Sequence, residues 1–167
     1  KVNGVNTLVG YLGNATELTL PADYKGENYV IGANVFKDNT TISSIVIPNS
    51  VTSIESYAFN GCTGLKEVHI SDIAAWCKID FGSSDANPLY YAKNLYLNGE
   101  LVTELVIPEG VTEIGDNAFS NCNSLTGVII PDSVTSIGNY TFSGCKYLTS
   151  VTIPESVTSI GYYAFSG

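Results

Sequence analysis

The sequence predicts one elongated solenoid, rich in short β-strands, and three observations support this fold class. Apolar residues make up 44% of the 167 residues and charged residues only 14%, so the chain is neither disordered nor a solvated coiled coil. A unit of 23 residues recurs along the chain, and its apolar residues fall at the same positions in each copy. A unit of this size cannot bury its own apolar residues, whereas stacked units share one continuous core.

The repeat divides the chain into regular and irregular parts. Complete copies open with Ile-Pro and a shortened copy ends the sequence, so that the four copies start at Ile47, Ile107, Ile130 and Ile153. We expect one domain over residues 1–167, with a cap or irregular coil at 1–17, repeats at 18–71, an expanded repeat at 72–107 and regular repeats at 108–167. Because the chain lacks a starting Met and stops within a copy, we interpret it as a piece of a longer protein whose targeting signals lie outside it.

Each unit is predicted to contain two short strands and one tight turn. In the copy that begins at Pro108, the residues expected to point into the core are Val111, Ile114, Ala118, Phe119, Cys122, Leu125, Val128 and Ile130. The Ala-Phe-x-x-Cys stretch is predicted to form one helical or 3₁₀ turn. A glycine after the second strand is expected to take a positive φ at a corner, at Gly115, Gly138 and Gly161. Equivalent phenylalanines are expected to stack in one ladder, formed by Phe36, Phe59, Phe119, Phe142 and Phe165.

The expanded repeat carries 14 extra residues and two local signals. Asn98-Gly99 lies between two apolar stretches and predicts a hairpin turn, with strands near Leu95–Leu97 and Leu101–Ile107. The stretch Ile73–Phe81 is expected to form one or two amphipathic turns. One interpretation is that this segment takes part in recognition, because insertions in solenoids often do. A small satellite core is the alternative, built by Trp76, Phe81 and Tyr90.

The repeated motif, IP-x-x-VT-x-IG-x-x-AF-x-x-C-x-x-L-T-x-V-x-I, resembles the BspA-like leucine-rich repeat, also called the Treponema pallidum type. The resemblance covers about Leu18 to Gly167, and the motif departs from it at Ser71 (for Pro), Val35 and Thr141 (both for Ala). It implies a curved leucine-rich repeat solenoid, a β-rich right-handed superhelix with a parallel sheet on its concave face and short 3₁₀ or helical turns and short strands elsewhere. It also implies a large secreted or cell-surface protein, mostly of host-associated bacteria, that binds host proteins or other cells.

Three of the four cysteines occupy one repeat position, where a small apolar side chain fills an inward site; they are Cys62, Cys122 and Cys145. We expect free thiols, because stacked side chains point side by side rather than at each other. A disulfide between Cys62 and Cys77 is the alternative. No Cys-x-x-Cys spacing exists and His69 is the only histidine, which argues against a zinc site.

No motif predicts catalysis or a bound cofactor. His69 is expected to face outward near Glu67, but no nucleophile motif accompanies it, so a solvated or partner-contacting role is favoured over general-base catalysis. Acids follow the repeat prolines and form a stack that suits calcium, although solvated turn residues explain them equally well; they are Glu109, Asp132 and Glu155. We therefore predict no catalytic, cofactor-binding or metal-binding residues.

The charge balance excludes two classes of partner. Sixteen acidic residues face seven lysines, there is no arginine, and the formal net charge is −9. Nucleic acids and anionic membrane surfaces both require clustered lysine or arginine. No apolar run approaches the roughly 18 residues that a membrane-spanning helix needs. We expect neither nucleic-acid binding nor direct membrane insertion.

The outward residues of the predicted sheet form the candidate binding surface. One row is expected to cross the sheet through Val46, His69, Val106, Ile129 and Thr152. The next row holds hydroxyls and carboxylates, and consists of Ser44, Glu67, Glu104, Gly127 and Ser150. An apolar row with a polar rim is typical of a moderate protein-binding surface, while the strand propensity of β-branched residues is the alternative explanation. The candidate partner-binding residues are the first row together with Glu67 and Glu104.

These observations favour a non-enzymatic protein-binding or adhesion module of a secreted or cell-surface bacterial protein. Wide and shallow repeat surfaces suit macromolecules better than small molecules, so a host or bacterial surface macromolecule is expected to bind the concave sheet. A structural spacer that displays other domains is the first alternative. Glycan binding is the second, with stacking faces from Tyr96, Trp76 or Tyr91.

Overall fold

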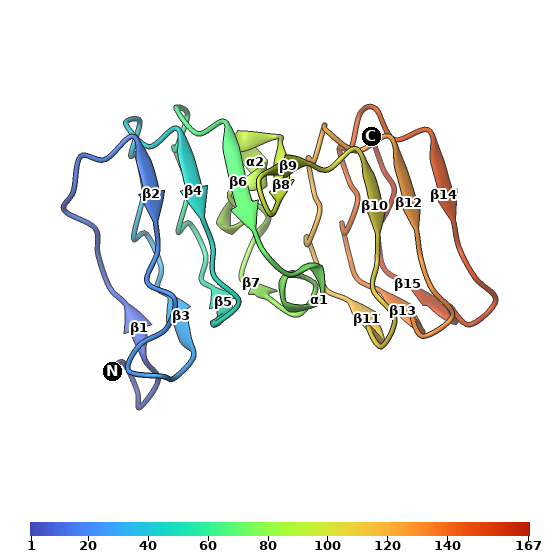
Figure 1. The fold of residues 1–167 in the computed structure, drawn as a ribbon, viewed down its shortest axis with the longest axis horizontal. Coiled ribbons are helices and arrows are strands. Elements are labelled where there is room, and N and C mark those ends of the chain that lie inside the picture. The colour runs from blue at the N-terminus through green and yellow to red at the C-terminus, as the bar shows by residue number, and fades with distance from the viewer.

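In a computed structural model, which describes residues 1–167, successive coils of the chain stack side by side along one axis (Figure 1). The predicted solenoid is confirmed. One sheet contains β2 (Glu17–Thr19), β4 (Ser44–Val46), β6 (Glu67–Ile70), β8 (Leu95–Leu97) and β9 (Glu100–Leu101), in that order. A second block on the same side contains β10 (Glu104–Val106), β12 (Gly127–Ile129) and β14 (Ser150–Thr152). All neighbours pair in parallel except β8 and β9, which are antiparallel.

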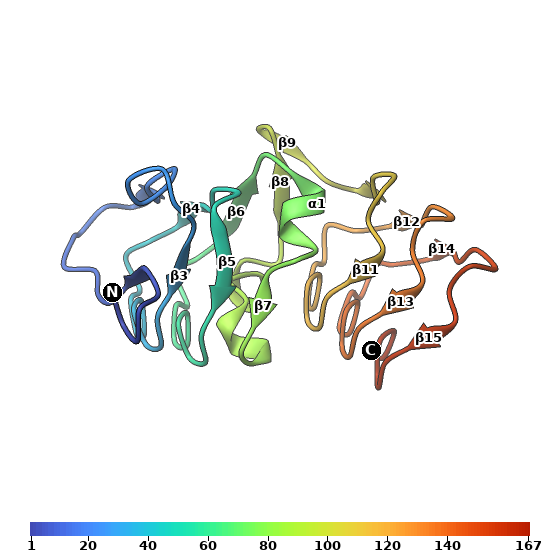
Figure 2. The ribbon, with the colours of Figure 1, turned by 90° about the horizontal axis from the view of Figure 1, so that it is seen from below.

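The second strand of each coil builds another sheet, which Figure 2 shows from below, and this sheet is also divided into two blocks. The first block contains β1 (Thr7–Leu8), β3 (Tyr29–Ile31), β5 (Val51–Ile54) and β7 (Asp80–Phe81). The second contains β11 (Glu113–Ile114), β13 (Ser136–Ile137) and β15 (Ser159–Ile160). Residues before the first recognisable repeat therefore take part in the solenoid, because β1 pairs in parallel with β3.

The core is one continuous cluster that runs the length of the solenoid. All eight residues predicted to point inward in the copy from Pro108 are buried. Phenylalanine rings stack between neighbouring coils, with centroid distances of 4.9 Å for Phe36–Phe59, 5.5 Å for Phe119–Phe142 and 5.3 Å for Phe142–Phe165. The predicted ladder thus exists as two stacks, one on each side of the expanded repeat.

The Ala-Phe-x-x-Cys stretch forms linked tight turns rather than a helix. The Cys122 amide donates to the Phe119 carbonyl at 3.1 Å, and the turn then pairs with the next coil through the Phe119 amide and the Thr141 carbonyl at 2.9 Å. Two positions in each turn take left-handed backbone, at Asn117 and Asn121 in this copy. Asparagine tolerates that conformation better than most residues with a side chain.

The expected positive φ at Gly115, Gly138 and Gly161 is wrong, because none of them is left-handed. Glycine is required there for a close approach between coils. A Cβ at Gly138 would lie 2.6 Å from the Asp116 nitrogen, and a Cβ at Gly161 would lie 2.5 Å from the Asn139 nitrogen. The backbones of successive coils touch at this position and leave no room for a side chain.

The expanded repeat completes a coil of its own before it reverses. It contains α1 (Ile73–Trp76), the 3₁₀ turn η1 (Ser84–Ala86), α2 (Leu89–Ala92) and the hairpin of β8 and β9. The predicted hairpin turn is confirmed, since Asn98 and Gly99 have φ of 52° and 88°. The strand expected over Leu101–Ile107 is broken, because β9 and β10 belong to different sheets. The satellite core is also wrong, because Trp76 and Phe81 belong to the main core while Tyr90 is exposed.

Both sheets are interrupted at the same place, between the expanded repeat and the coil that contains β10 and β11. The buried side chains of Trp76 and Asn87 cross this interruption. The Trp76 indole N–H donates to the Ala118 carbonyl at 2.8 Å, and the Asn87 amide donates to the Asn117 and Ala118 carbonyls at 2.8 and 3.1 Å. These side chains therefore join the two blocks where the strands themselves are unpaired. Backbone hydrogen bonds outside the strands add to them, from Gly115 N–H to the Cys77 carbonyl at 3.0 Å and from Asn123 N–H to the Lys93 carbonyl at 2.8 Å.

Candidate protein-binding face

We use the term strand face for the outward surface of two blocks. The first block consists of β2, β4, β6, β8 and β9, and the second of β10, β12 and β14. The predicted single row across this face is wrong, because the structure divides it into two rows. In the first block, His69 lies beside Val46 on one side and Tyr96 on the other. In the second block, Val106, Ile129 and Thr152 lie side by side. Val106 is not the neighbour of His69, because residues 72–97 complete a coil whose strand, β8, lies between them.

The first row contains a polar cluster on β6 and β8. The rings of His69 and Tyr96 stack at a centroid distance of 4.6 Å and an angle of 18°. Glu67 Oε2 lies 3.0 Å from His69 Nε2, which orients the imidazole. The His69 side chain is 25% exposed and the Glu67 side chain 42% exposed, so both remain accessible to a partner. Val46, the next residue in the row, is half-buried.

Sequence reasoning missed the contact of Tyr96 with His69, and it missed Leu101. Leu101 follows Tyr96 across the hairpin and is 44% exposed. The Asn98-Gly99 turn predicted the hairpin itself. Repeat spacing gave no guide to its register, since β6 and β8 are offset by 27 residues (Val68 to Leu95) rather than 23.

The second row is more apolar and more exposed. The side chains of Val106 and Ile129 are 56% and 49% exposed, and Thr152 beside them is exposed as well. Glu104 stands at the rim, where its carboxylate lies against Gly127 and accepts a hydrogen bond from Thr126 Oγ1 at 3.3 Å. Two neighbouring β-branched side chains with a carboxylate beside them make a small apolar patch on a rigid sheet.

Of the three aromatic residues considered for glycan stacking, Trp76 is excluded because it is only 1% exposed. Tyr91 is half-buried, and its hydroxyl accepts a hydrogen bond from the Gly61 amide at 2.8 Å. Tyr96 lies on the strand face, with one side of its ring covered by His69. The aromatic surface offered to a sugar ring is therefore small.

The cysteines are free and buried, as predicted. Burial raises the pKa of Cys122 to about 11 and that of Cys145 to about 12. Cys62 and Cys145 donate to the carbonyls of Phe36 and Phe119 in the preceding coils, each at 3.1 Å. These thiols act as small core side chains that also hydrogen bond between coils. No group of three or more His, Cys, Asp or Glu side chains is arranged to hold a metal ion.

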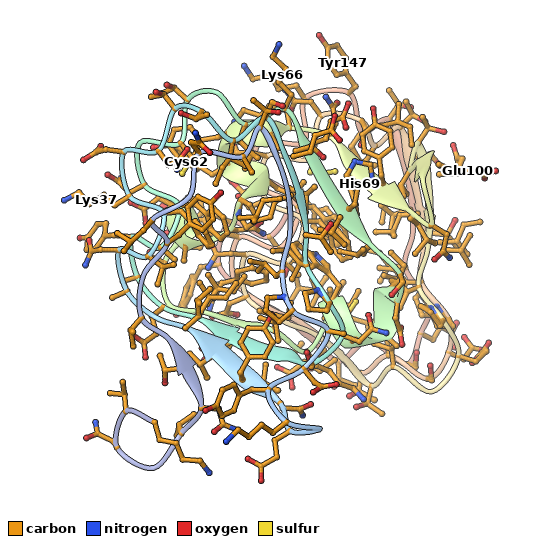
Figure 3. The ribbon with its side chains drawn as sticks, turned by 60° about the vertical axis from the view of Figure 1, so that its left-hand side comes forward. Lys37, Cys62, Lys66, His69, Glu100 and Tyr147 are labelled. Carbon is orange, nitrogen blue, oxygen red and sulfur yellow. The ribbon has the colours of Figure 1, made fainter.

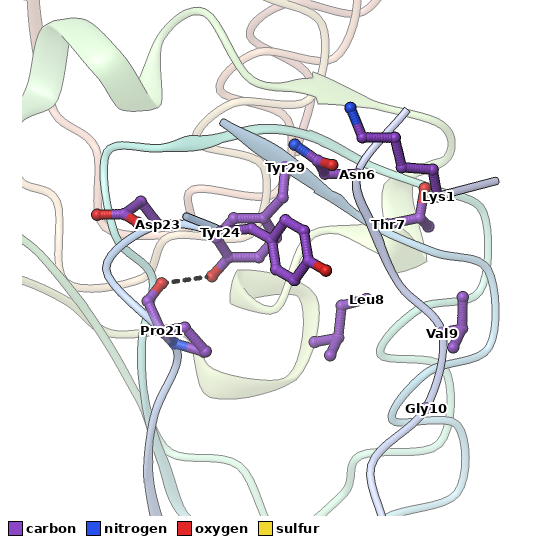
Figure 4. A pocket seen from close by; sticks show the side chains of 10 residues that line it. All are labelled: Lys1, Asn6, Thr7, Leu8, Val9, Gly10, Pro21, Asp23, Tyr24 and Tyr29. Carbon is purple, nitrogen blue, oxygen red and sulfur yellow. Dashed lines mark hydrogen bonds between the residues drawn. The ribbon is translucent and has the colours of Figure 1, made fainter. Parts of the chain in front are cut away.

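A pocket of about 240 Å³ lies near the N-terminus, between the first two coils (Figure 4). Two of its polar side chains, Tyr29 and Asn6, donate hydrogen bonds to neighbouring groups. The Tyr29 hydroxyl donates to the Pro21 carbonyl at 2.8 Å, and the Asn6 amide donates to Glu27 and to the Asn28 carbonyl at 2.8 and 3.1 Å. The hydrogen bond from Asn6, followed by the charge of Lys1, lowers the pKa of Glu27. These contacts hold the first coil to the second, so the strand face is the stronger candidate site.

Figure 3 shows Lys37, Lys66 and Glu100 directed away from the body, while Cys62 lies within the coils. None of the short helices has the length and apolar character needed to cross a membrane.

The repeat geometry defines a leucine-rich repeat protein of the short-coil, β-rich kind. The family model described as BspA type leucine-rich repeat region matches residues 29–79 and 92–167 in six copies. The chain therefore belongs to the BspA type leucine-rich repeat family. Leucine-rich repeat domains are in general scaffolds for protein interactions.

Solved structures of bacterial proteins share the fold. A leucine-rich cell surface protein from Faecalibacterium prausnitzii is 32% identical, with a TM-score of 0.62 over 99% of this chain and 48% of that one. The leucine-rich repeat protein of T. pallidum is 25% identical, with a TM-score of 0.56 over 93% of this chain and 77% of that one. A leucine-rich repeat protein from Eubacterium ventriosum has a TM-score of 0.62 at 24% identity, over 97% of this chain and 46% of that one. The chain thus spans about half the length of the first and third of these proteins. No curated protein sequence matches it significantly.

Proposed function

We propose that this chain is a non-enzymatic binding module of a secreted or cell-surface bacterial protein, and that its strand face captures host or bacterial surface macromolecules. The exposed pair Val106 and Ile129 carries this proposal. Two large apolar side chains side by side on a rigid sheet lose little conformational entropy on binding, and the polar rim at Glu104 adds orientation. The cell-surface description of the F. prausnitzii protein supports the proposed location.

The test introduces positive charge on the strand face. The variant that combines Val106→Lys with Ile129→Lys is expected to fold normally, because both side chains point to solvent, and to lose capture of serum or extracellular-matrix proteins by at least tenfold. A matched control, Thr112→Lys with Ser159→Lys, adds the same charge at exposed positions on the opposite side of the coils, just before β11 and in β15. Capture is measured by pull-down, and folding by circular dichroism. Equal capture by the two variants would reject the strand face as the site.

The first row is a second part of the same proposed interface. His69 and Glu67 present a hydrogen-bonding pair beside the half-buried Val46, and Tyr96 adds an aromatic edge.

A spacer function predicts no capture by the unaltered chain in the same pull-down. A glycan function predicts binding on a glycan array that is lost in Tyr96→Ala and kept in the double-lysine variant.

A further inference from the structure

The interruption of the strand face leaves two sheet edges that face one another. β9 ends the first block and β10 begins the second, so neither strand has a hydrogen-bonded neighbour on that side. A groove of about 290 Å³ lies between them. Its floor is apolar, since Ile73, Val102 and Leu105 are buried there. An unpaired strand beside an apolar groove is a template for the addition of another strand.

The free backbone groups of β10 can be identified from its pairing with β12. The Ile107 amide donates to the Ile129 carbonyl at 3.0 Å, and the Thr103 carbonyl accepts from the Gly127 amide at 3.3 Å. Backbone groups of successive residues in a strand point to opposite edges. The N–H and C=O groups of Glu104 and Val106 therefore point away from β12 and toward the groove.

The charge around the groove selects the kind of chain that fits. Glu100 and Glu104 are exposed among its lining residues, and no lysine lines it. A second copy of this chain is disfavoured because each copy carries a net charge of −9. An added strand would turn alternate side chains down onto the apolar floor and the others out to solvent. Those outward side chains would lie near Glu100 and within reach of Glu104, whose carboxylate rests over Gly127 of β12.

We propose that the groove between β9 and β10 binds an extended basic peptide segment of another protein, in which apolar and lysine or arginine residues alternate, as an additional strand on the edge of β10. The apolar side chains lie on Ile73, Val102 and Leu105. The basic side chains lie beside Glu100 and Glu104. This goes beyond the proposed function, because recognition here depends on backbone pairing at the sheet edge rather than on the exposed side chains of Val106 and Ile129.

The test uses a short fluorescent peptide that alternates lysine and leucine, with binding to the whole chain measured by fluorescence anisotropy. Glu104→Pro removes the edge N–H, and a proline at a free strand edge is compatible with folding. We expect it to weaken binding at least tenfold, while Glu104→Gln, which keeps the N–H, weakens binding only a few fold. Ile129→Lys is expected to leave peptide affinity within twofold, which separates this proposal from the proposed function.

Two further measurements identify strand addition even if Glu104→Pro fails to fold. N-methylation of alternate peptide amides in one phase should abolish binding, and methylation in the other phase should preserve it. The amide hydrogens of Glu104 and Val106 should exchange quickly in the free chain and slow at least tenfold with peptide bound. Equal binding of both methylated peptides, or unchanged exchange at Val106, would overturn the proposal. A peptide-free dimer that protects the same amides would also overturn it, because the occupant would be a second copy.

Discussion

At the residue scale, the cysteines show how one side chain meets two requirements of a stacked coil. Each regular coil needs a small apolar group beneath the phenylalanine stack, and Cys62, Cys122 and Cys145 fill that site with exposed fractions of 1%, 0% and 4%. In two of them the thiol also donates to a carbonyl of the preceding coil. Burial without a nearby cation disfavours the thiolate, which makes these groups inert at neutral pH.

The raised thiol pKa values predict that the protein loses stability in alkali. Burial raises the pKa of Cys122 from 9.0 to about 11, so the unfolded chain releases its proton at a lower pH than the folded chain. The stabilising effect is complete below about pH 9 and is lost as the pH rises toward 11, because the unfolded state then binds fewer protons. Urea denaturation across this range should show the free energy of unfolding falling less steeply in Cys122→Ala than in the unaltered chain. Parallel curves for the two proteins would contradict this assignment.

At the element scale, the contact between successive coils is closest where strand gives way to turn. Gly115 N–H donates to the Cys77 carbonyl at 3.0 Å, and Gly138 N–H donates to the Ile114 carbonyl at 2.8 Å. These bonds draw the backbones together at a position where a Cβ would overlap the preceding coil. The glycine thus sets the spacing between coils.

Gly138→Ala is therefore expected to destabilise the fold through overlap between coils. Its Cβ would meet the Asp116 nitrogen at 2.6 Å and the Gly115 carbonyl carbon at 2.8 Å, and neither is a flexible side-chain atom. Overpacking of this kind costs about 1–3 kcal/mol, which a urea titration resolves. The matched control is Gly10→Ala, where no atom lies within 4 Å of the added Cβ and φ is not left-handed. Gly10→Ala is expected to be neutral or slightly stabilising, because alanine reduces the backbone entropy of the unfolded chain. A loss as large in Gly10→Ala as in Gly138→Ala would reject overlap between coils as the cause.

The regular elements were predictable from sequence because each coil places equivalent residues in the same surroundings. Periodic apolar positions identified buried residues such as Val111 and Leu125, since a side chain that faces the core in one coil faces it in all. The sequence showed that glycine recurs after the second strand of each coil, but not why. Positive φ and close approach both select glycine, and the predicted positive φ was wrong. The placement of His69 beside Tyr96 could not be predicted, since it depends on where α1, η1 and α2 close a coil, and spacing alone does not fix that point.

At the scale of the whole molecule, the solenoid consists of two blocks that must be held together at their interruption. In regular coils the carbonyl of the residue before Phe accepts the amide of the preceding coil, as in Phe142 N–H to the Ala164 carbonyl at 2.8 Å. The equivalent carbonyl of Ala118 has no such backbone donor. The side chains of Trp76 and Asn87 supply the hydrogen bonds instead. Repeat proteins unfold cooperatively only while neighbouring units remain coupled. These two side chains contribute to that coupling, together with the shared core and the backbone hydrogen bonds that Gly115 and Asn123 donate to the preceding coil.

Replacement of both donors is expected to uncouple the blocks. Trp76→Phe and Asn87→Leu each leave one donor on the Ala118 carbonyl, whereas the double variant leaves a buried acceptor unpaired at a further cost of about 1–3 kcal/mol. A double-mutant cycle from urea denaturation should therefore give a coupling energy larger than about 0.5 kcal/mol. Hydrogen exchange followed by mass spectrometry should show residues 104–167 and residues 1–101 losing protection together in each single variant and at different urea concentrations in the double variant. Additive losses with simultaneous exchange in all variants would mean that the continuous core and the backbone hydrogen bonds across the interruption, rather than these side-chain donors, couple the two halves.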